Sequence, residues 1–255
     1  MGATIDIRSL TKTFGAGPGA VHAFGPIDLT IESGSFVSLL GPSGCGKSTL
    51  MLMIAGLLGA TRGDVFFDDA KVDGPRTDIG IMFQDNTLVP WRTVEGNVAL
   101  QLELRGLNPR DYRTRIHDLL RSVKLDGFQH RHPYELSGGM QQRAAFCQAL
   151  VHEPDTLLFD EPLGKLDAMT RESIRTDLQA LWMQKRPTVV FVTHSIEEAV
   201  QLSSTVCVVT PRPGRIERRI EIDLPWPRDL EVKASARFTQ YVREIQGIFH
   251  DYGVL

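Results

Sequence analysis

Apolar residues in this chain form short uninterrupted runs and helical stripes, and the two patterns alternate. Short runs rich in β-branched residues are typical of strands buried in a parallel sheet. The predicted strands are 3–8, 26–31, 35–40, 63–69, 78–83, 156–160 and 188–193. They lie on both sides of a long helical stretch, which predicts a parallel-sheet core interrupted by a helical insertion.

The helical stripes complete this outline. A buried helix is expected from about 47 to 58, and residues 94–152 are expected to be mainly helical. Before the strand at 188–193, apolar residues at helical spacing line one face of a further helix: Ile174, Leu178 and Leu181. A C-terminal stripe is expected to pack on the sheet core or on a neighbour: Phe238, Tyr241, Val242, Ile245, Ile248 and Phe249.

Composition narrows the class of protein. The 255 residues are 42% hydrophobic and 23% charged, which is ordinary for a soluble globular chain. A net charge of −3 gives no basic field that would favour nucleic acid. The three cysteines are far apart and favour neither a disulfide framework nor a zinc site, so a reducing compartment is expected. We expect no signal peptide, and the apolar run at 50–60 is too short to span a bilayer, so membrane contact would need a partner.

The stretch GPSGCGKST (41–49) matches the phosphate-binding pattern G-x-x-x-x-G-K-[ST]. It follows the apolar run SFVSLL and opens a predicted helix, and this context disfavours the simpler interpretation as a glycine-rich turn. Glycines allow backbone N–H groups to wrap phosphates, Lys47 would reach the β- and γ-phosphates, and Ser48 would bind Mg²⁺. The candidate nucleotide-binding residues are Gly41, Pro42, Ser43, Gly44, Cys45, Gly46, Lys47, Ser48 and Thr49.

Polar residues stand where three predicted strands end. Asp160 and Glu161 close the run LLFDE, His194 follows TVVFVT, and Gln84 follows DIGIMF. The carboxyl ends of parallel strands are where open α/β sheets bind ligands. Asp160 would hold Mg²⁺, and Glu161 would polarise a water against the γ-phosphate. Each residue alone could simply end a strand, but together with the phosphate loop they predict a site.

A second anion-binding signal lies at LSGGM (136–140). Ser137 can cap a helix that begins with Gly138 and Gly139, and a helix N-terminus with a capping Ser favours anions. A plain N-cap would explain Ser137. It gives no reason for two consecutive glycines, which weaken a first helical turn.

In order and spacing, these motifs resemble the ATP-binding cassette ATPases of ABC transporters. The likeness extends from Phe14 to about residue 220. GPSGCGKSTL, LSGGM and PRPGRI (211–216) resemble, more narrowly, the ATPases of bacterial importers for nitrate, aliphatic sulfonates and taurine. The resemblance implies an α/β fold: a P-loop NTPase (RecA-like) core with an antiparallel β subdomain and an inserted α-helical subdomain. It also implies ATP and Mg²⁺ as cofactors.

The same resemblance assigns roles to single residues. Phe14 would stack on adenine, although an apolar strand-end residue is a serious alternative. Ser48, Gln84 and Asp160 would hold Mg²⁺, while Glu161, His194, Gln84 and Lys47 would be catalytic. Two cassettes would face each other head to tail. Ser137, Gly138 and Gly139 would then complete the site of the other copy, and Asp167 would be the D-loop aspartate.

The resemblance further implies domains and partners. The single ATPase domain, 1–255, would comprise a nucleotide-binding core (1–87 and 156–222), a helical signature subdomain (88–155) and a C-terminal helical extension (223–255). Residues 85–97 would expose Leu88, Pro90 and Trp91 to a permease subunit; a hinge with its own small core is the alternative. The chain would form an ATP-bound homodimer on the cytoplasmic face of the bacterial inner membrane, held by the permease and served indirectly by a solute-binding protein.

Two motifs depart from the family pattern: the D-loop, and the signature, where Gln141 follows Met140 in place of a frequent Arg, a change expected to be benign. The D-loop reads Gly164-Lys165-Leu166-Asp167 in place of Ser-Ala-Leu-Asp, so Lys165 could weaken the dimer by repulsion across a two-fold axis. Other functions remain open. A P-loop small-molecule kinase would leave LSGGM and His194 unexplained. A chromosome-maintenance or translation ATPase would need a longer insertion or two sets of motifs. An ABC ATPase of an exporter, or of another solute class, is the nearest alternative.

Overall fold

The computed structural model describes residues 2–85 and 87–254. The chain divides into two compact units, Met1–Arg76 with Gln179–Leu255, and Thr77–Leu178. Helix α5 (Ala168–Lys185) contributes residues to both. The apolar stripe predicted for α5 is buried at Ile174 and Leu178. Its third predicted member, Leu181, is only half-buried, and the neighbouring Trp182 is buried in its place.

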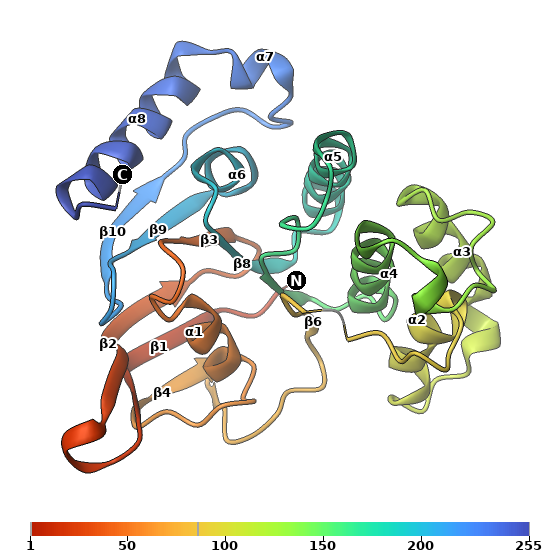
Figure 1. Cartoon of the computed structure of the whole chain (residues 1–255), viewed down its shortest axis with the longest axis horizontal. Helices are drawn as coiled ribbons and strands as arrows, with labels where there is room; N and C mark the ends of the chain where they lie inside the picture. Colours follow the sequence, from red (N-terminus) through yellow and green to blue (C-terminus); the bar gives the residue numbers. More distant parts are fainter. Residues whose placement is uncertain (1, 86, 255) are drawn as a thin grey trace. The chain divides into compact units, whose positions relative to one another are not determined.

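The first unit contains an antiparallel sheet in the strand order β2-β1-β4-β5; Figure 1 shows β2, β1 and β4 side by side. Its strands are β1 (Ile5–Phe14), β2 (Val21–Ile31), β4 (Arg62–Phe67) and β5 (Ala70–Lys71). Alternate apolar side chains of β1 point into the core, as at Ile5 and Ile7, because successive residues of a strand face opposite sides. A short 3₁₀ turn, η1 (Gly17–Gly19), precedes β2.

A second sheet of the first unit has the order β10-β9-β3-β8. Its strands are β3 (Phe36–Leu40), β8 (Thr188–Thr193), β9 (Thr205–Val209) and β10 (Ile216–Glu221). β3 pairs in parallel with β8 and β9, whereas β10 runs antiparallel to β9. All residues of β3, β8 and β9 are buried, as continuous apolar runs predict.

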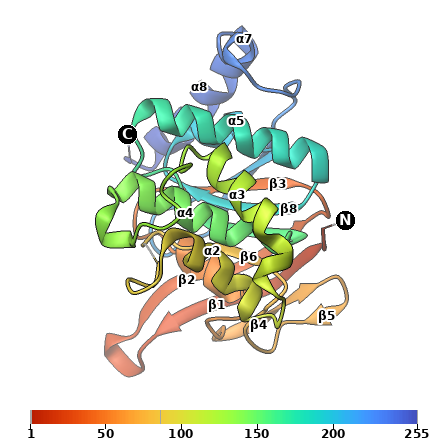
Figure 2. The same ribbon diagram turned by 90° about the vertical axis from the view of Figure 1, so that its right-hand side faces the viewer.

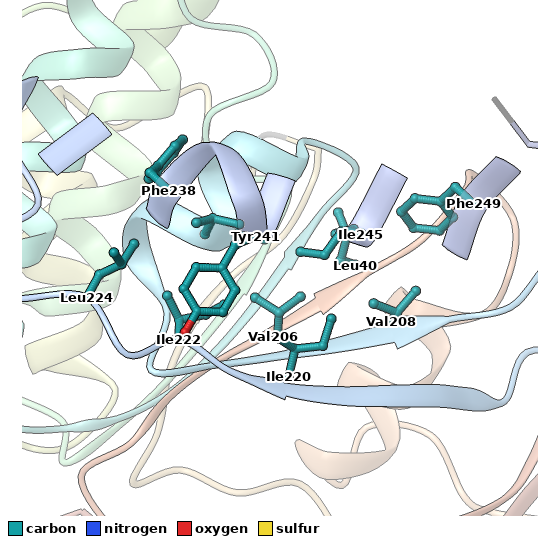
Figure 3. Close-up of a cluster of buried hydrophobic side chains, with 12 residues drawn as sticks. Leu40, Val206, Val208, Ile220, Ile222, Leu224, Phe238, Tyr241, Ile245 and Phe249 are labelled. Atoms are coloured by element: carbon teal, nitrogen blue, oxygen red, sulfur yellow. The ribbon is translucent and has the colours of Figure 1, made fainter. Parts of the chain in front are cut away.

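Four α-helices complete the first unit: α1 (Lys47–Ile54), α6 (Ile196–Leu202), α7 (Leu230–Lys233) and α8 (Ala236–Asp251). Figure 1 shows α8 beside α6 and strands β9 and β10. Phe238, Tyr241, Ile245 and Phe249 of α8 pack on Val206 and other side chains of this sheet (Figure 3). The C-terminal stripe therefore covers the sheet core, as expected from the sequence.

Arg228 is a buried cation that ties the C-terminal extension to this unit. Its side chain is wholly buried, and its guanidinium donates to the carbonyls of Val200 (2.7 Å), Ser203 (2.6 Å) and Ile222 (2.9 Å). Burial lowers the pKa of Arg228 to about 10. The first two carbonyls belong to the end of α6, so Arg228 satisfies backbone acceptors that the helix itself leaves unpaired.

The second unit combines a parallel strand pair with a group of helices. The strands are β6 (Gly80–Met82) and β7 (Thr156–Asp160). The helical elements are α2 (Val94–Glu103), η2 (Pro109–Tyr112), α3 (Arg113–Ser122), η3 (Pro133–Glu135) and α4 (Gly138–Leu150). Figure 2 shows α2 and α3 alongside α4, which is buried along most of its length. In the described part of the chain, no helix has the length and apolar character needed to cross a membrane.

Candidate active site

The phosphate loop, residues 41–49, joins β3 to α1 in the first unit. Gly46 precedes α1 with a left-handed φ of 102°, and a Cβ there would lie 2.9 Å from the ring of Phe24. Glycine is therefore required on conformational and steric grounds. The first N–H groups of α1 have no acceptor within the helix and lie at its positive end. The loop thus offers backbone donors suited to a phosphate.

Lys47 lies inside this loop. Its side chain is buried, and its Nζ donates to the carbonyls of Gly41 and Pro42, both at 2.8 Å. The ammonium group is thereby held against the loop backbone, where phosphate oxygens would approach. The remaining loop residues range from exposed Ser43 and Gly44, through half-buried Ser48 and Thr49, to buried Cys45.

His194 reaches the same edge of the sheet as the phosphate loop. β3 and β8 are parallel neighbours, and Leu40 pairs with Thr193. Gly41 and His194 directly follow these two residues, so they leave the same end of adjacent strands, and His194 is exposed there.

Phe14, the residue predicted to stack on adenine, ends β1 with its side chain 43% exposed, and the Lys12 ammonium lies 5.1 Å from its ring centre.

In the second unit, Gln84 and Glu161 meet at the ends of β6 and β7. Met82 pairs with Phe159 in parallel register, and two residues further along each strand Gln84 Nε2 donates to Glu161 Oε2 at 3.3 Å. Asp160 is the last residue of β7 and is buried. The structure thus brings together the predicted base and the predicted water-contacting amide.

The backbone at Glu161 is strained. Its φ of +47° lies in the left-handed region, which non-glycine residues rarely adopt. Such conformations cluster at functional sites, where surrounding contacts must hold them. The Glu161 carbonyl accepts from the Gly164 N–H at 3.2 Å and from Gln142 Nε2 at 3.4 Å.

Gln142 was not among the predicted site residues. It is buried on α4, and its Oε1 has no hydrogen-bond partner among the described residues. It lines a cavity of about 120 Å³ together with Gln84, Gly138 and Lys165. The sequence displays Gln142 only as a polar residue in an amphipathic helix, which gives no signal of a contact with the carbonyl of Glu161.

Ser137 caps α4 as expected, because its Oγ accepts from the Met140 N–H at 3.3 Å. The two glycines that follow have no steric reason in this chain. A Cβ on Gly138 would meet nothing within 4 Å, and one on Gly139 would make ordinary contacts with Leu166 at 3.5 Å. The second unit therefore accounts for Ser137 and leaves the need for Gly138 and Gly139 unexplained.

The D-loop residues have partners within the second unit. Asp167 Oδ1 accepts from the Thr170 N–H at 3.0 Å, and hydrogen bonds from the side chain and backbone of Thr170 lower the pKa of Asp167. Lys165 Nζ lies 3.3 Å from Asp85 Oδ1. A carboxylate thus stands beside the ammonium group that the sequence predicts to repel a second copy.

The loop at 85–97 corrects one expectation. Trp91 is 78% exposed and Pro90 is exposed, but Leu88 is buried. The buried Asn97 side chain folds this loop by bonding to both the N–H and the carbonyl of Val89, at 2.7 and 3.1 Å. Leu88 packs inward next to that anchor, so the exposed apolar surface is smaller than predicted. Asn86 lies outside the described residues.

The predicted metal ligands do not form one carboxylate-rich cluster. Within residues 2–85 and 87–254, no group of three or more His, Cys, Asp or Glu residues is arranged to hold a metal ion. Ser48 belongs to the first unit, whereas Gln84 and Asp160 belong to the second. Their joint site remains a prediction.

Comparison with known proteins agrees with this geometry. Residues 24–164 match the ABC transporter family. An uncharacterised ABC transporter ATP-binding protein of Methanocaldococcus jannaschii, MJ0412, is 44% identical over 248 residues, 97% of this chain and 91% of that protein. The aliphatic sulfonates import ATP-binding protein SsuB of Bacillus cereus is 39% identical, covering 99% of this chain and 98% of SsuB. The taurine import ATP-binding protein TauB of Rhizobium johnstonii is 44% identical and covers 90% of each chain.

A solved structure extends the likeness to three dimensions. The dimeric post-hydrolysis structure of the ATP-binding cassette MJ0796, bound to ADP and Pi, is 33% identical with a TM-score of 0.78 and covers 86% of this chain and 98% of that one. This confirms the expected P-loop NTPase core with β and helical subdomains. Sequence, motif geometry and fold therefore agree that this chain belongs to the ABC transporter family.

Proposed function

We propose that this chain is the ATP-hydrolysing subunit of a bacterial importer for a sulfonate, taurine, nitrate or a similar small solute. The observation that carries the proposal is the phosphate loop with Lys47 bound to the carbonyls of Gly41 and Pro42. The direction of transport and the solute class rest on the names of similar proteins, SsuB and TauB. ATP hydrolysis itself follows from membership of the family.

Glu161 is proposed as the general base. Its carboxylate would take a proton from a water whose oxygen forms a bond to the γ-phosphorus, while the bond from that phosphorus to the ADP oxygen breaks. Gln84, at 3.3 Å from Glu161, would orient the same water, and His194 would donate to the γ-phosphate. The loop N–H groups and Lys47 would stabilise the charge on the phosphates.

Mg²⁺, when bound, would neutralise phosphate charge, with Ser48, Gln84 and Asp160 as its proposed ligands. An oxygen-rich set with one buried carboxylate suits Mg²⁺, which keeps part of its water shell and shares the phosphates as ligands. Phe14 is proposed to stack on adenine, because its exposed ring lies at a strand end of the first unit, which carries the phosphate loop.

The signature residues Ser137, Gly138 and Gly139 are proposed to act on the nucleotide of a second copy. The absence of any steric need for these glycines in this chain supports that idea, because small residues there let another molecule approach the α4 N-terminus. The dimeric state of the similar cassette MJ0796 is consistent with two cooperating copies. Asp167 would lie near the same interface.

We further propose that residues 85–97 contact the permease on the cytoplasmic face of the bacterial inner membrane. Trp91, exposed on a loop anchored by Asn97, is a rigid aromatic of the kind that dominates protein interfaces. A solute-binding protein would act only through the permease. The predicted domain limits, with 88–155 as a helical subdomain and 223–255 as an extension, belong to this proposal.

The experiment begins by purifying the chain from the native membrane together with its permease and identifying that permease. The complex is then placed in proteoliposomes, and phosphate release is measured with and without the candidate solutes and the binding protein. The proposal expects Mg-ATP hydrolysis that is stimulated by loaded binding protein and abolished in Lys47→Ala. Hydrolysis coupled to outward movement of a solute would instead establish the exporter alternative.

A further inference from the structure

The segment between β9 and β10, residues 210–215, carries the PRPGR part of a motif that has no role so far. This segment, here called the strap, packs on the phosphate loop within the first unit. Directly before the strap, at the last residue of β9, the Val209 carbonyl oxygen would lie 2.7 Å from a Cβ on Gly41. Near the end of the strap, a Cβ on Gly214 would overlap the carbonyl of Cys45. The backbone thus approaches the loop closely at Val209 and again at Gly214, on either side of the loop apex.

Arg212 makes the contact between these two points. Its Nη2 and Nε donate to the Gly44 carbonyl oxygen at 3.0 and 3.3 Å. Gly44 is at the exposed apex of the loop with a φ of +76°, and because glycine has wide conformational freedom, a contact from outside the loop restricts the conformations that it samples. Two donors on one planar guanidinium fix a carbonyl in direction as well as in distance.

Holding this carbonyl also orients the adjacent N–H group. The C=O and N–H of one planar peptide point in opposite directions, so a Gly44 carbonyl directed at Arg212 turns the Cys45 N–H to the other side. There the Cys45 N–H lies 3.4 Å from the Pro42 carbonyl oxygen, which also accepts from Lys47. Arg212 therefore directs a loop N–H group toward the side on which the Lys47 ammonium lies.

Arg212 also brings a positive charge to the loop. Among residues 2–85 and 87–254, no carboxylate forms an ion pair with Arg212. A neutral carbonyl is its partner, so a full positive charge stays beside the apex of a loop that suits phosphate. A guanidinium remains charged at any physiological pH.

We propose that Arg212 is a positioning residue for nucleotide phosphates, fixing the apex of the phosphate loop and adding an unpaired positive charge beside it. This rests on the proposed function, that the loop binds ATP. The contribution is to binding, because Arg212 acts on the phosphate loop. Arg212 should therefore increase the affinity for both nucleoside diphosphates and nucleoside triphosphates.

The experiment compares ADP binding by calorimetry and steady-state Mg-ATP kinetics for wild type, Arg212→Met, Arg212→Lys and Arg215→Met in the full chain. Arg212→Met should raise the Kd for ADP and the KM for ATP by about tenfold while changing kcat less than about twofold. Arg212→Lys should fall between, because lysine keeps the charge but not the two-donor fork. Arg215→Met removes the same charge from the same strap and should match wild type.

A thermal melt without nucleotide separates binding from folding. Arg212 is exposed, so its variants should melt with wild type, and Arg212→Lys supplies the comparison if Arg212→Met does not fold. Equal ADP binding by wild type and Arg212→Met would overturn the inference and leave the proposed function intact. Equal weakening by Arg215→Met would also overturn it, since the position of Arg212 would then be irrelevant. A wild-type chain that bound no ADP would overturn both.

Discussion

Among single residues, Glu161 combines three unusual features. It follows a buried strand, has a left-handed φ of +47°, and shares a hydrogen bond with Gln84. A glutamate with a strained backbone and a hydrogen-bonded carboxylate is suited to be a base that must face one water molecule. The sequence predicts Glu161 from its place after an apolar run, but the strain becomes visible only in the structure.

Glu161→Gln should therefore lower the rate of ATP hydrolysis by roughly 10²- to 10⁴-fold, because the amide keeps the shape and cannot accept the proton. ADP affinity should be retained, since the phosphate loop is unchanged. Phosphate release at saturating Mg-ATP and ADP calorimetry are the measurements, with Glu231→Gln on α7 as the matched change at an exposed site. If Glu161→Gln hydrolysed ATP near the wild-type rate, Glu161 could not be the general base.

Gln142 gives a second test at this scale, with Gln148 as an internal control. Both are buried on α4, and both donate to a backbone carbonyl, Gln142 to Glu161 at 3.4 Å and Gln148 to Asn97 at 3.0 Å. Gln142→Leu should lower kcat by about tenfold with KM unchanged, because the carbonyl behind the base loses a donor. Gln148→Leu should cost about 1–3 kcal/mol of unfolding free energy and leave kcat intact.

The kinetic comparison depends on a background control. In a Glu161→Gln chain the base is already absent, so adding Gln142→Leu should lower the residual rate little further. Equal kcat losses in Gln142→Leu and Gln148→Leu would show a general effect of packing in α4 and would rule out positioning of Glu161.

Residue types that carry chemistry at strand ends are predictable, whereas residues that support them are not. Gln84 and Glu161 stand out because polar side chains follow apolar runs, and the structure places them 3.3 Å apart. Gln142, Arg212 and Arg228 act on backbone carbonyls. A carbonyl is the same at every position, so the sequence has no pattern that pairs these side chains with their acceptors.

At the level of elements, buried strands are predicted best. The runs at 156–160 and 188–193 match β7 and β8 at every residue, since a continuous apolar stretch between polar residues leaves little freedom. Helix α1 ends at Ile54, before the predicted 58, because Gly56 adopts a φ of +71° and a Cβ there would overlap the carbonyl of Gly74. β9 was missed although TVCVV is itself a continuous apolar run, and Leu88 was wrongly expected to be exposed because the hydrogen bonds from Asn97 to Val89 fold the loop and turn Leu88 inward.

The ends of α2 and α4 meet at a half-buried pair, Arg105 and His152. Arg105 Nη2 lies 3.0 Å from His152 Nε2 and also donates to the Thr77 carbonyl at 2.6 Å. Burial, and then the charge of Arg105, lower the pKa of His152 to about 4. His152 is therefore neutral in the folded chain at pH values where the unfolded chain binds a proton.

Stability should accordingly fall with acid in a defined window. Below the ordinary histidine pKa of about 6.5, His152 binds a proton in the unfolded chain but not in the folded chain. The unfolding free energy therefore drops as the pH falls from 6.5 toward 4. His152→Gln keeps an acceptor for Arg105 and should flatten this part of the profile, whereas His130→Gln at an exposed site should not. Urea unfolding at pH 7.5, 6.0 and 5.0 measures the unfolding free energy of each variant. If the unfolding free energies of wild type and His152→Gln fell in parallel with pH, the account would be contradicted.

For the whole molecule, the proposal assigns anion binding to two helix ends, one at Lys47 and one at Ser137. The first is built by its own unit, with Gly46 required by φ and by the ring of Phe24. The second carries two glycines that its own unit does not need. A head-to-tail pair of copies explains the difference, because each Ser137 end would then face the nucleotide on the other copy's Lys47.

Lys165 bears on the stability of that pair. Its ammonium lies 3.3 Å from Asp85, so a repulsion between two copies of Lys165 would be offset by two carboxylates. Both side chains are largely exposed, so solvent weakens the repulsion as well as the ion pair, each to about 1 kcal/mol or less. We therefore expect the dimer to tolerate this departure from the usual D-loop.

Mixing two inactive variants tests the shared site most directly. Lys47→Ala removes the phosphate-loop ammonium, and Ser137→Arg blocks the α4 N-terminus, so each variant alone should hydrolyse no ATP. In a heterodimer one site carries both defects and the other carries neither, so an equal mixture should recover up to about a quarter of the wild-type rate. Sedimentation with Mg-ATP must show that the two chains associate. Recovery of hydrolysis is the predicted result, and an associated mixture that stays inactive would contradict the account.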